Sequence, residues 1–239
     1  MWTRQELKMN AKAAFKQNYW RCVLAGIIWT FATGCAATYS YVNQDEQQAQ
    51  IDALMADGTF TPSVAIAFLS IVAAVLIISF LFFIFIRNPL VVSVARFFKS
   101  NSSQRAECGE FKHPFSGGRY LKTVGTLLLE DIIIALFSIL LIIPGIVKCY
   151  DYYLVKFILA DEPELSGKEA LRKSKEMMRG HRWNTFVLNL SFIPWFLLGG
   201  ITLGLVNIFY VMPYVLQTDA QLYLKIKGEA AAEAPAEAL

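Results

Sequence analysis

Apolar residues gather in six stretches of the chain, and charged or turn-forming residues separate these stretches from one another. A helix of about 20 residues crosses the roughly 30 Å hydrocarbon core of a bilayer. The pattern therefore predicts an all-α integral membrane protein with a single membrane domain over residues 1–227. The expected spans are residues 22–42, 63–86, 123–143, 146–160, 183–198 and 201–217.

Two of the separating segments are turn sequences rather than loops. Pro144-Gly145 lies between the third and fourth spans, and Gly199-Gly200 lies between the fifth and sixth. Proline and glycine favour a reversal of the chain at these points. Together with the loop between the first two spans, they predict three transmembrane hairpins. The fourth span is short, and we expect neighbouring helices to help it cross.

Two polar segments, residues 3–16 and 166–180, have the pattern of amphipathic helices. Each begins with Ser or Thr and has Glu three residues later, which is the capping-box signature. Apolar residues recur on one helical face, and Lys or Arg covers another. Such helices can lie on an anionic inner leaflet, or pack the apolar stripe on protein and leave the cations in water. The expected headgroup contacts are Arg4, Lys8, Lys12, Lys16, Arg172, Lys173 and Lys175.

The distribution of charge predicts which loops face the cytoplasm. Residues 43–61 contain four acidic residues and no Lys or Arg, whereas residues 100–122 are basic and the region from Lys148 to Arg182 contains eight Lys or Arg. Positively charged loops stay on the cytoplasmic side. We therefore expect a multi-pass membrane protein with both termini in the cytoplasm.

The composition agrees with a membrane protein. Of the 239 residues, 56% are hydrophobic and only 17% are charged, and the net charge is +3. No nucleic-acid-binding motif accompanies the basic residues, which lie beside apolar spans, so we expect anionic lipids and not nucleic acid as partners. The Ala/Glu/Pro segment 228–239 lacks the hydrophobicity to fold, and we expect a disordered tail.

Five residues with charged side chains fall inside the third and fourth spans. Charges are expensive in a membrane and often mark function. If the chain folds back at Pro144-Gly145, Glu130 and Lys156 lie on adjacent helices with an offset of about 5 Å along them, which their side chains can bridge, so we predict an ion pair. Lys148 and Asp151 form a second pair three residues apart. The pairs either lock the hairpin or form a polar site. The candidate polar site is Glu130, Asp131, Lys148, Asp151 and Lys156.

No residue pattern indicates catalysis or a bound cofactor. The four cysteines lack metal-ligand spacing, and we interpret them as free thiols. Cys108 and His113 in a polar loop are too few ligands to indicate a metal site. Neither an HExxH nor a GxSxG motif occurs. We therefore expect no catalytic, cofactor-binding or metal-binding residues.

The segments that enter the first, third and fifth spans look alike, each with a polar or basic stop, an aromatic residue and an apolar run. They begin at Asn18, Gly118 and His181. This likeness predicts three copies of a helix followed by a hairpin. Any segment that passes from the cytoplasm into a membrane favours a cation and an aromatic residue at that point. This preference alone also explains much of the likeness among the three segments.

Several short motifs occur together along nearly the whole chain. They are Asn18-Tyr19-Trp20, Asn88-Pro89-Leu90, Ile143-Pro144-Gly145-Ile146, Ile158-Leu159-Ala160-Asp161 and Met177-Met178 before Gly180. In this combination the chain resembles a family of Gram-positive bacterial integral membrane proteins known as domain of unknown function 975. The resemblance implies a multi-pass plasma-membrane protein and supplies no substrate, reaction or catalytic residue.

Two functions are compatible with these features. The first is a non-catalytic membrane protein that binds a lipid, a peptide or a partner protein, as the interrupted hairpins and basic helices suggest. The alternative is a small transporter or channel-like carrier with a polar site around Glu130, Asp131 and Lys156. An intramembrane enzyme is disfavoured because both histidines fall outside the predicted spans.

Overall fold

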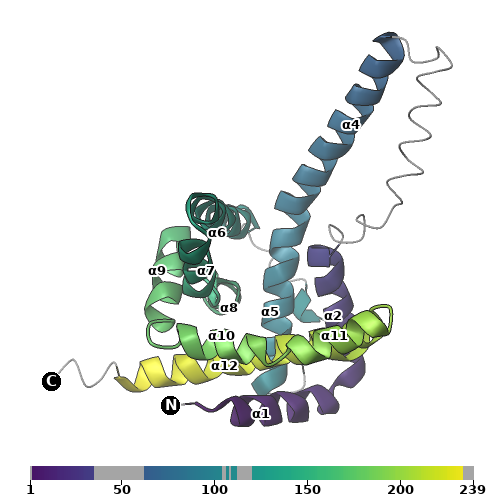
Figure 1. Cartoon of the computed structure of the whole chain (residues 1–239). Coiled ribbons are helices and arrows are strands. Elements are labelled where there is room, and N and C mark those ends of the chain that lie inside the picture. The colour runs from purple at the N-terminus through teal and green to yellow at the C-terminus, as the bar shows by residue number, and fades with distance from the viewer. Residues whose placement is uncertain (1, 35–61, 104–105, 108, 112–119, 234–239) are drawn as a thin grey trace.

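The computed structural model describes residues 2–34, 62–103, 106–107, 109–111 and 120–233, and these residues contain no strand. The first helices are α1 (Arg4–Gln17), α2 (Tyr19–Gly34), α4 (Pro62–Phe82), the π-helix η2 (Phe83–Arg87) and α5 (Asn88–Ser103). The next are α6 (Tyr120–Leu140), α7 (Ile142–Asp151), α8 (Val155–Asp161) and α9 (Gly167–Met177). The last are α10 (Arg182–Leu190), α11 (Ile193–Ile201), the π-helix η4 (Asn207–Val211) and α12 (Met212–Glu233) (Figure 1).

Three helical stretches among the described residues are long and apolar enough to cross a membrane. They are Ile66–Ser103, Tyr120–Leu140 and Arg182–Ile201. The side chains of Leu69 and Ile78 on α4 are 64% and 66% exposed. Apolar surface of this extent is typical of a membrane-facing or protein-binding surface. The chain is therefore an all-helical protein with the features of a membrane protein.

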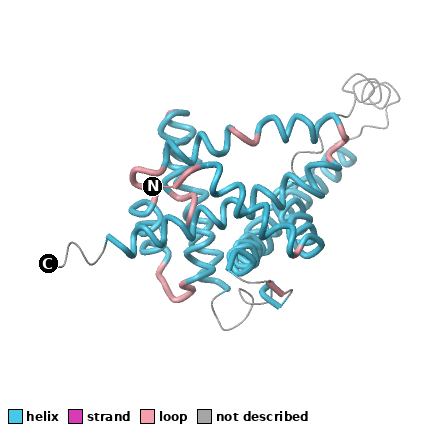
Figure 2. The backbone as a smooth tube through the Cα atoms, turned by 90° about the horizontal axis from the view of Figure 1, so that it is seen from below, coloured by secondary structure: helices cyan, strands magenta, loops and turns pink. Residues whose placement is uncertain are grey.

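The three candidate spans do not run parallel to one another. In Figure 1, α4 runs up the page away from the other helices, α11 and α12 run across it, and α6 is seen almost end on. Figure 2, viewed from below, shows that short loops join most of the described helices. Helices α2, α6 and α10 begin at or near the three similar entry segments. The six-span arrangement and the internal repeat stay predictions.

The first amphipathic helix forms as predicted, but its apolar stripe is covered by protein. Thr3 caps α1 by accepting a hydrogen bond from the backbone N–H of Glu6. The stripe of Leu7, Ala11, Ala14 and Phe15 is buried, and α1 packs against α12 and α5. Of the two alternatives for this stripe, the structure therefore shows packing on protein.

A buried amide at the centre of the fold connects four helices. Asn101 of α5 donates hydrogen bonds to the carbonyl oxygen of Ala14 at 3.1 Å and to Oε1 of Gln217 at 2.7 Å. Its Oδ1 accepts from Nδ2 of Asn18 at 2.9 Å. These bonds hold α1, the start of α2 and α12 around α5. A buried amide is stable only when its donors and acceptors are satisfied in this way.

The reversal between the third and fourth predicted spans lies earlier than predicted. The backbone is extended at Leu141, and Pro144 and Gly145 lie in the first turn and a half of α7. Proline is tolerated there because the first helical N–H groups have no intrahelical partner. A Cβ atom on Gly145 would lie 2.4 Å from Oγ of Ser138, so glycine allows α7 to approach α6 closely.

The fourth predicted span, residues 146–160, is not one helix. The helix is interrupted between Asp151, where α7 ends, and Val155, where α8 begins. Ser174 of α9 satisfies the backbone at this break: its Oγ donates to the carbonyl oxygen of Asp151 at 2.8 Å and accepts from the N–H of Leu154 at 3.3 Å. α9 has the predicted Ser166/Glu169 capping box and ends at Met177, three residues before the predicted boundary.

The reversal before the sixth predicted span lies beyond Gly199-Gly200. Leu203 and Gly204 adopt φ angles of 51° and +84°, and they form the turn after α11. Gly199 instead provides close packing, because a Cβ atom there would overlap the side chain of Asn207. α12 continues to Glu233, so residues 228–233 of the predicted tail are helical, and residues 234–239 lie outside the described residues.

A carboxylate at the end of α8 joins α5 and α12. Asp161 forms ion pairs with Lys99 and Lys227 and accepts a hydrogen bond from the Tyr223 hydroxyl at 2.8 Å. Burial alone would raise the pKa of Asp161, but the hydrogen bonds from Lys227, Lys99 and Tyr223 outweigh burial and hold this pKa well below its usual range. Folding is therefore linked to the ionised form of Asp161.

The stability that Asp161 contributes is expected to disappear in acid. Because its pKa is lower in the folded state, this contribution is complete above the unfolded-state pKa of about 3.9 and is lost as the pH falls below that value. Asp161→Asn should lower the melting temperature in detergent at neutral pH and flatten its fall in acid. The control is Glu176→Gln, which changes an exposed carboxylate of α9. An unchanged acid profile in Asp161→Asn would contradict the linkage.

Candidate functional site

A polar cavity of about 180 Å³ lies where α2, α5, α6 and the α7–α8 break meet. Residues at helical spacing on α6 form one wall, because positions 127, 130, 131 and 134 share a face. Four charged side chains line the cavity, and Trp29 and Tyr153 add aromatic surface. The lining residues are Trp29, Thr33, Arg87, Asn88, Val91, Leu127, Glu130, Asp131, Ile134, Cys149, Tyr153 and Lys156.

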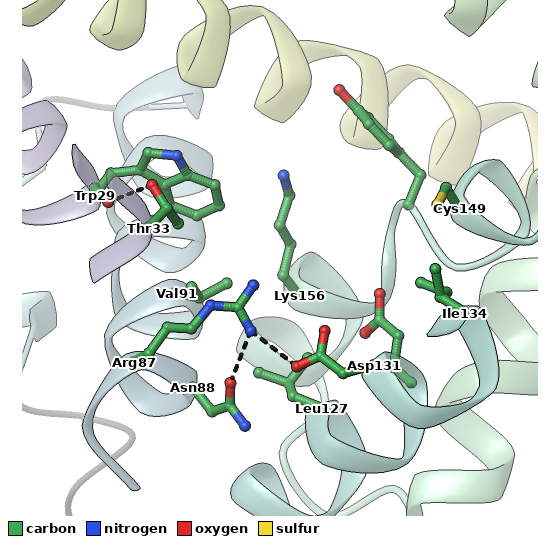
Figure 3. A pocket seen from close by; sticks show the side chains of 12 residues that line it. Trp29, Thr33, Arg87, Asn88, Val91, Leu127, Asp131, Ile134, Cys149 and Lys156 are labelled. Atoms are coloured by element: carbon green, nitrogen blue, oxygen red, sulfur yellow. Dashed lines mark hydrogen bonds and ion pairs between the residues drawn. The ribbon is translucent and has the colours of Figure 1, made fainter. Parts of the chain in front are cut away.

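Arg87 and Asp131 form an ion pair at the edge of the cavity. Nη1 of Arg87 lies 2.9 Å from Oδ2 of Asp131 and donates to Oδ1 of Asn88 at 3.2 Å. Figure 3 shows the guanidinium group between these two partners. Arg87 is the last residue of the π-helix η2, so the irregular backbone there helps to place this side chain.

Lys156 belongs to a second charged network. Its Nζ lies 3.5 Å from Oδ2 of Asp219 on α12, and the Tyr153 hydroxyl donates to Oδ1 of the same carboxylate at 2.7 Å. The ammonium group also lies 4.9 Å from the centre of the Trp29 ring. Such contacts with aromatic faces stabilise a desolvated cation. In Figure 3, Lys156 extends away from the Arg87–Asp131 pair.

Glu130 has no such partner among the described residues. Its Oε2 is buried and forms no hydrogen bond with any described residue. The two cations that line the cavity, Arg87 and Lys156, are engaged with Asp131 and Asp219 respectively. A buried acceptor without a partner is energetically unfavourable. Glu130 is therefore the group in this cavity that a bound donor would satisfy.

The structure brings together part of the predicted polar site. Glu130, Asp131 and Lys156 line one cavity, but the predicted Glu130–Lys156 ion pair is wrong, because Lys156 pairs with Asp219. The prediction assumed one straight helix after the turn, whereas the break at Tyr152–Leu154 changes the position of Lys156. The sequence analysis did not include Asp219 in the polar site because this residue follows the predicted end of the sixth span. The polar run Gln217-Thr218-Asp219 within an apolar helix could have indicated it.

The predicted Lys148–Asp151 pair forms, and it lies outside the cavity. Nζ of Lys148 is 3.5 Å from Oδ2 of Asp151. Nε of Arg182 lies 2.5 Å from Oδ1 of the same carboxylate, at an angle outside hydrogen-bond geometry. This second cation comes from α10, so the cluster connects α7 to α10. We interpret it as structural.

The predicted headgroup cations have different surroundings. Arg4, Lys12, Lys16 and Lys175 are exposed. Lys173 pairs with Glu162 at 2.5 Å, and Arg172 lies 3.8 Å from Glu176. Lys8 is only partly exposed and lies against the α10–α11 connection, 3.4 Å from the carbonyl oxygen of Ser191. The row of cations on α1 is therefore not uniform.

No group of three or more His, Cys, Asp or Glu side chains in the described part of the chain could hold a metal ion. Cys22 and Cys149 are free thiols. Cys35, Cys108 and His113 lie outside the described residues.

Comparison with known proteins identifies a family and no activity. The model of the family described as "Protein of unknown function (DUF975)" matches residues 1–230. Neither the curated proteins nor the solved structures gave a significant match.

Proposed function

Because the chain belongs to the family described as "Protein of unknown function (DUF975)", which assigns no activity, we propose from the cavity that it is a non-catalytic membrane protein that binds an amine group. The amine would belong to a lipid, a peptide or a partner protein. The observation that carries the proposal is the buried Oε2 of Glu130, which has no hydrogen-bond partner among the described residues.

The chemistry of the cavity favours an ammonium group over an anion. The Arg87–Asp131 and Lys156–Asp219 pairs each balance one positive and one negative charge. Glu130 leaves one acceptor in excess, and the aromatic faces of Trp29 and Tyr153 line the same space. Carboxylates and aromatic faces are the groups that bind alkylammonium ions. The small volume fits a headgroup or a side-chain terminus and not a whole peptide.

The cellular setting is part of the same proposal. The acidic loop 43–61 and the basic segments support a multi-pass plasma-membrane topology with six spans and both termini in the cytoplasm. Lys12, Lys16 and Lys175 are exposed and suited to contact anionic lipid headgroups. One chain supplies all the lining residues of the cavity.

The binding proposal predicts that ethanolamine raises the melting temperature of the purified chain in detergent and that ethylene glycol does not. The two probes differ mainly in the ammonium group, so the difference reports charge recognition. Glu130→Gln should abolish the ethanolamine shift, since the amide carries no negative charge. Glu176→Gln, at an exposed carboxylate on α9, should retain it. An equal shift from both probes, or a full shift in Glu130→Gln, would contradict the proposal.

Transport is the second candidate, and irregular backbone beside the cavity favours it. Tyr153 at the α7–α8 break and Arg87 at the end of η2 both line the cavity. Carriers build binding sites from interrupted helices of this kind. Uptake of labelled ethanolamine into proteoliposomes, lost in Glu130→Gln, would favour a carrier; binding without uptake favours the first proposal.

A further inference from the structure

A second hollow lies between α1 and α10, and it shares no lining residue with the polar cavity. This α1–α10 groove has a volume of about 700 Å³. Arg4 and Lys8 of α1 line one side, and Trp183, Asn184 and Val187 of α10 line the other. No acidic side chain is among its lining residues.

The groove is held open by contacts at both of its ends. At one end the buried Trp2 donates a hydrogen bond from Nε1 to Nδ1 of His181 at 3.2 Å. At the other end Nζ of Lys8 lies 3.4 Å from the carbonyl oxygen of Ser191 and 4.3 Å from the centre of the Phe192 ring. These contacts connect α1 to the residues just before and just after α10, on either side of the groove.

The positive charge in the groove has no acidic counterpart among the described residues. Neither Arg4 nor Lys8 forms an ion pair there, and the acidic residue between them in sequence, Glu6, pairs with Lys225 of α12. Burial, and after it the nearby charge of Arg4, lowers the pKa of Lys8. Two neighbouring cations in a partly desolvated groove are stabilised by a bound anion.

The apolar surroundings point to an anion that carries hydrocarbon chains. The groove opens at the start of the candidate span Arg182–Ile201. Trp183 is 71% exposed there, and indole rings concentrate at the headgroup level of membranes. Along the same span Leu190, Ile193 and Leu197 are also exposed. A free phosphate ion would use the cations and leave this apolar surface uncovered.

We propose that the α1–α10 groove binds an anionic phospholipid, with its phosphate between Arg4 and Lys8 and its acyl chains along the exposed apolar surface of α10 and α11. This site is separate from the amine-binding cavity at Glu130. It also differs from general attraction of α1 to an anionic leaflet, because Lys12 and Lys16 lie on the same helix but outside the groove.

The test compares lipid binding to matched charge variants of the full chain. Phosphatidylglycerol is titrated into the purified protein in detergent, and bound lipid is counted by native mass spectrometry. Arg4→Gln/Lys8→Gln should bind about thirtyfold more weakly, from roughly fivefold for each basic residue at a lipid headgroup. The control Lys12→Gln/Lys16→Gln removes the same charge from the same helix. These exposed lysines can meet anionic headgroups only at a bilayer surface, so in detergent their loss should change affinity less than about threefold, as expected for weak exposed charges.

A further variant and a competitor keep the result decisive. Asn184→Asp adds a negative charge to the groove, leaves α1 intact and should also weaken binding. Dissolved sn-glycerol 3-phosphate should not displace the lipid, because it lacks acyl chains. Three results would overturn the proposal. Equal losses of affinity in the two double variants would mean general attraction of lipid to the surface, and no loss in the groove variants would mean that the lipid binds at another site. Displacement of the lipid by glycerol phosphate would mean that the groove binds a soluble phosphate ligand.

Discussion

Asn101→Ala is expected to lower the melting temperature of the protein in detergent by roughly 6–12 °C, which corresponds to about 3 kcal/mol for a chain of this size. The reason is the number of groups left without partners. Asn101 is 4% exposed, and its loss removes the donor to Oε1 of Gln217 and to the carbonyl oxygen of Ala14. Each buried polar group left unsatisfied costs about 1–3 kcal/mol.

The matched control for this prediction is Asn10→Ala, an exposed asparagine on α1. It should change the melting temperature by less than about 2 °C, as surface substitutions usually do. Nδ2 of Asn18 keeps its bond to the carbonyl oxygen of Ala106, so the loss falls mainly on α1 and α12. A parent-like melting temperature in Asn101→Ala would mean that the amide does not hold these helices together.

Features that depend on local sequence were predicted well. The capping box of Ser166 and Glu169 and the buried stripe of α1 both appear as the helical spacing indicates. The pair Lys148–Asp151 forms for the same reason, since residues three apart on one helix are neighbours. In each case both partners lie within one or two helical turns, so spacing alone brings them together.

Features that depend on tertiary contacts were predicted poorly. The break between α7 and α8 is stabilised by Ser174, a residue from another helix that sequence spacing does not connect with Asp151. The position of Lys156 depends on this break, so the predicted partner Glu130 was wrong and Asp219 was missed. The membrane pattern identifies apolar helices, but it contains no information on their directions, which differ in Figure 1.

The contrast between Glu130 and its charged neighbours decides where ligand binding should be sought. Lys156 and Asp219 already satisfy each other, and the Tyr153 hydroxyl completes the network. Glu130 lines the same cavity with a buried oxygen that nothing described satisfies. The paired residues therefore have a structural explanation, and Glu130 does not.

Lys156→Met is expected to destabilise the protein by about 3 kcal/mol, because it leaves the carboxylate of Asp219 buried without its cation. The two side chains are 15% and 5% exposed, so little water replaces the lost ammonium group. The hydrogen bond from Tyr153 to Asp219 remains in this variant and keeps the cost at the lower end of the range for broken buried pairs. Thermal unfolding in detergent measures the change.

The double variant Lys156→Met/Asp219→Leu is expected to recover most of that stability, since removing both charges of a buried pair leaves no unpaired ion. Tyr153 then retains a partner in Asn189, whose Oδ1 lies 3.3 Å from its hydroxyl. The double variant should also keep the ethanolamine-induced rise in melting temperature, because Glu130 and Trp29 are unchanged. A double variant as unstable as Lys156→Met would show that the ion pair contributes more than charge balance. Loss of the ethanolamine response in a stable double variant would show that the amine binds at the Lys156–Asp219 pair and not at Glu130.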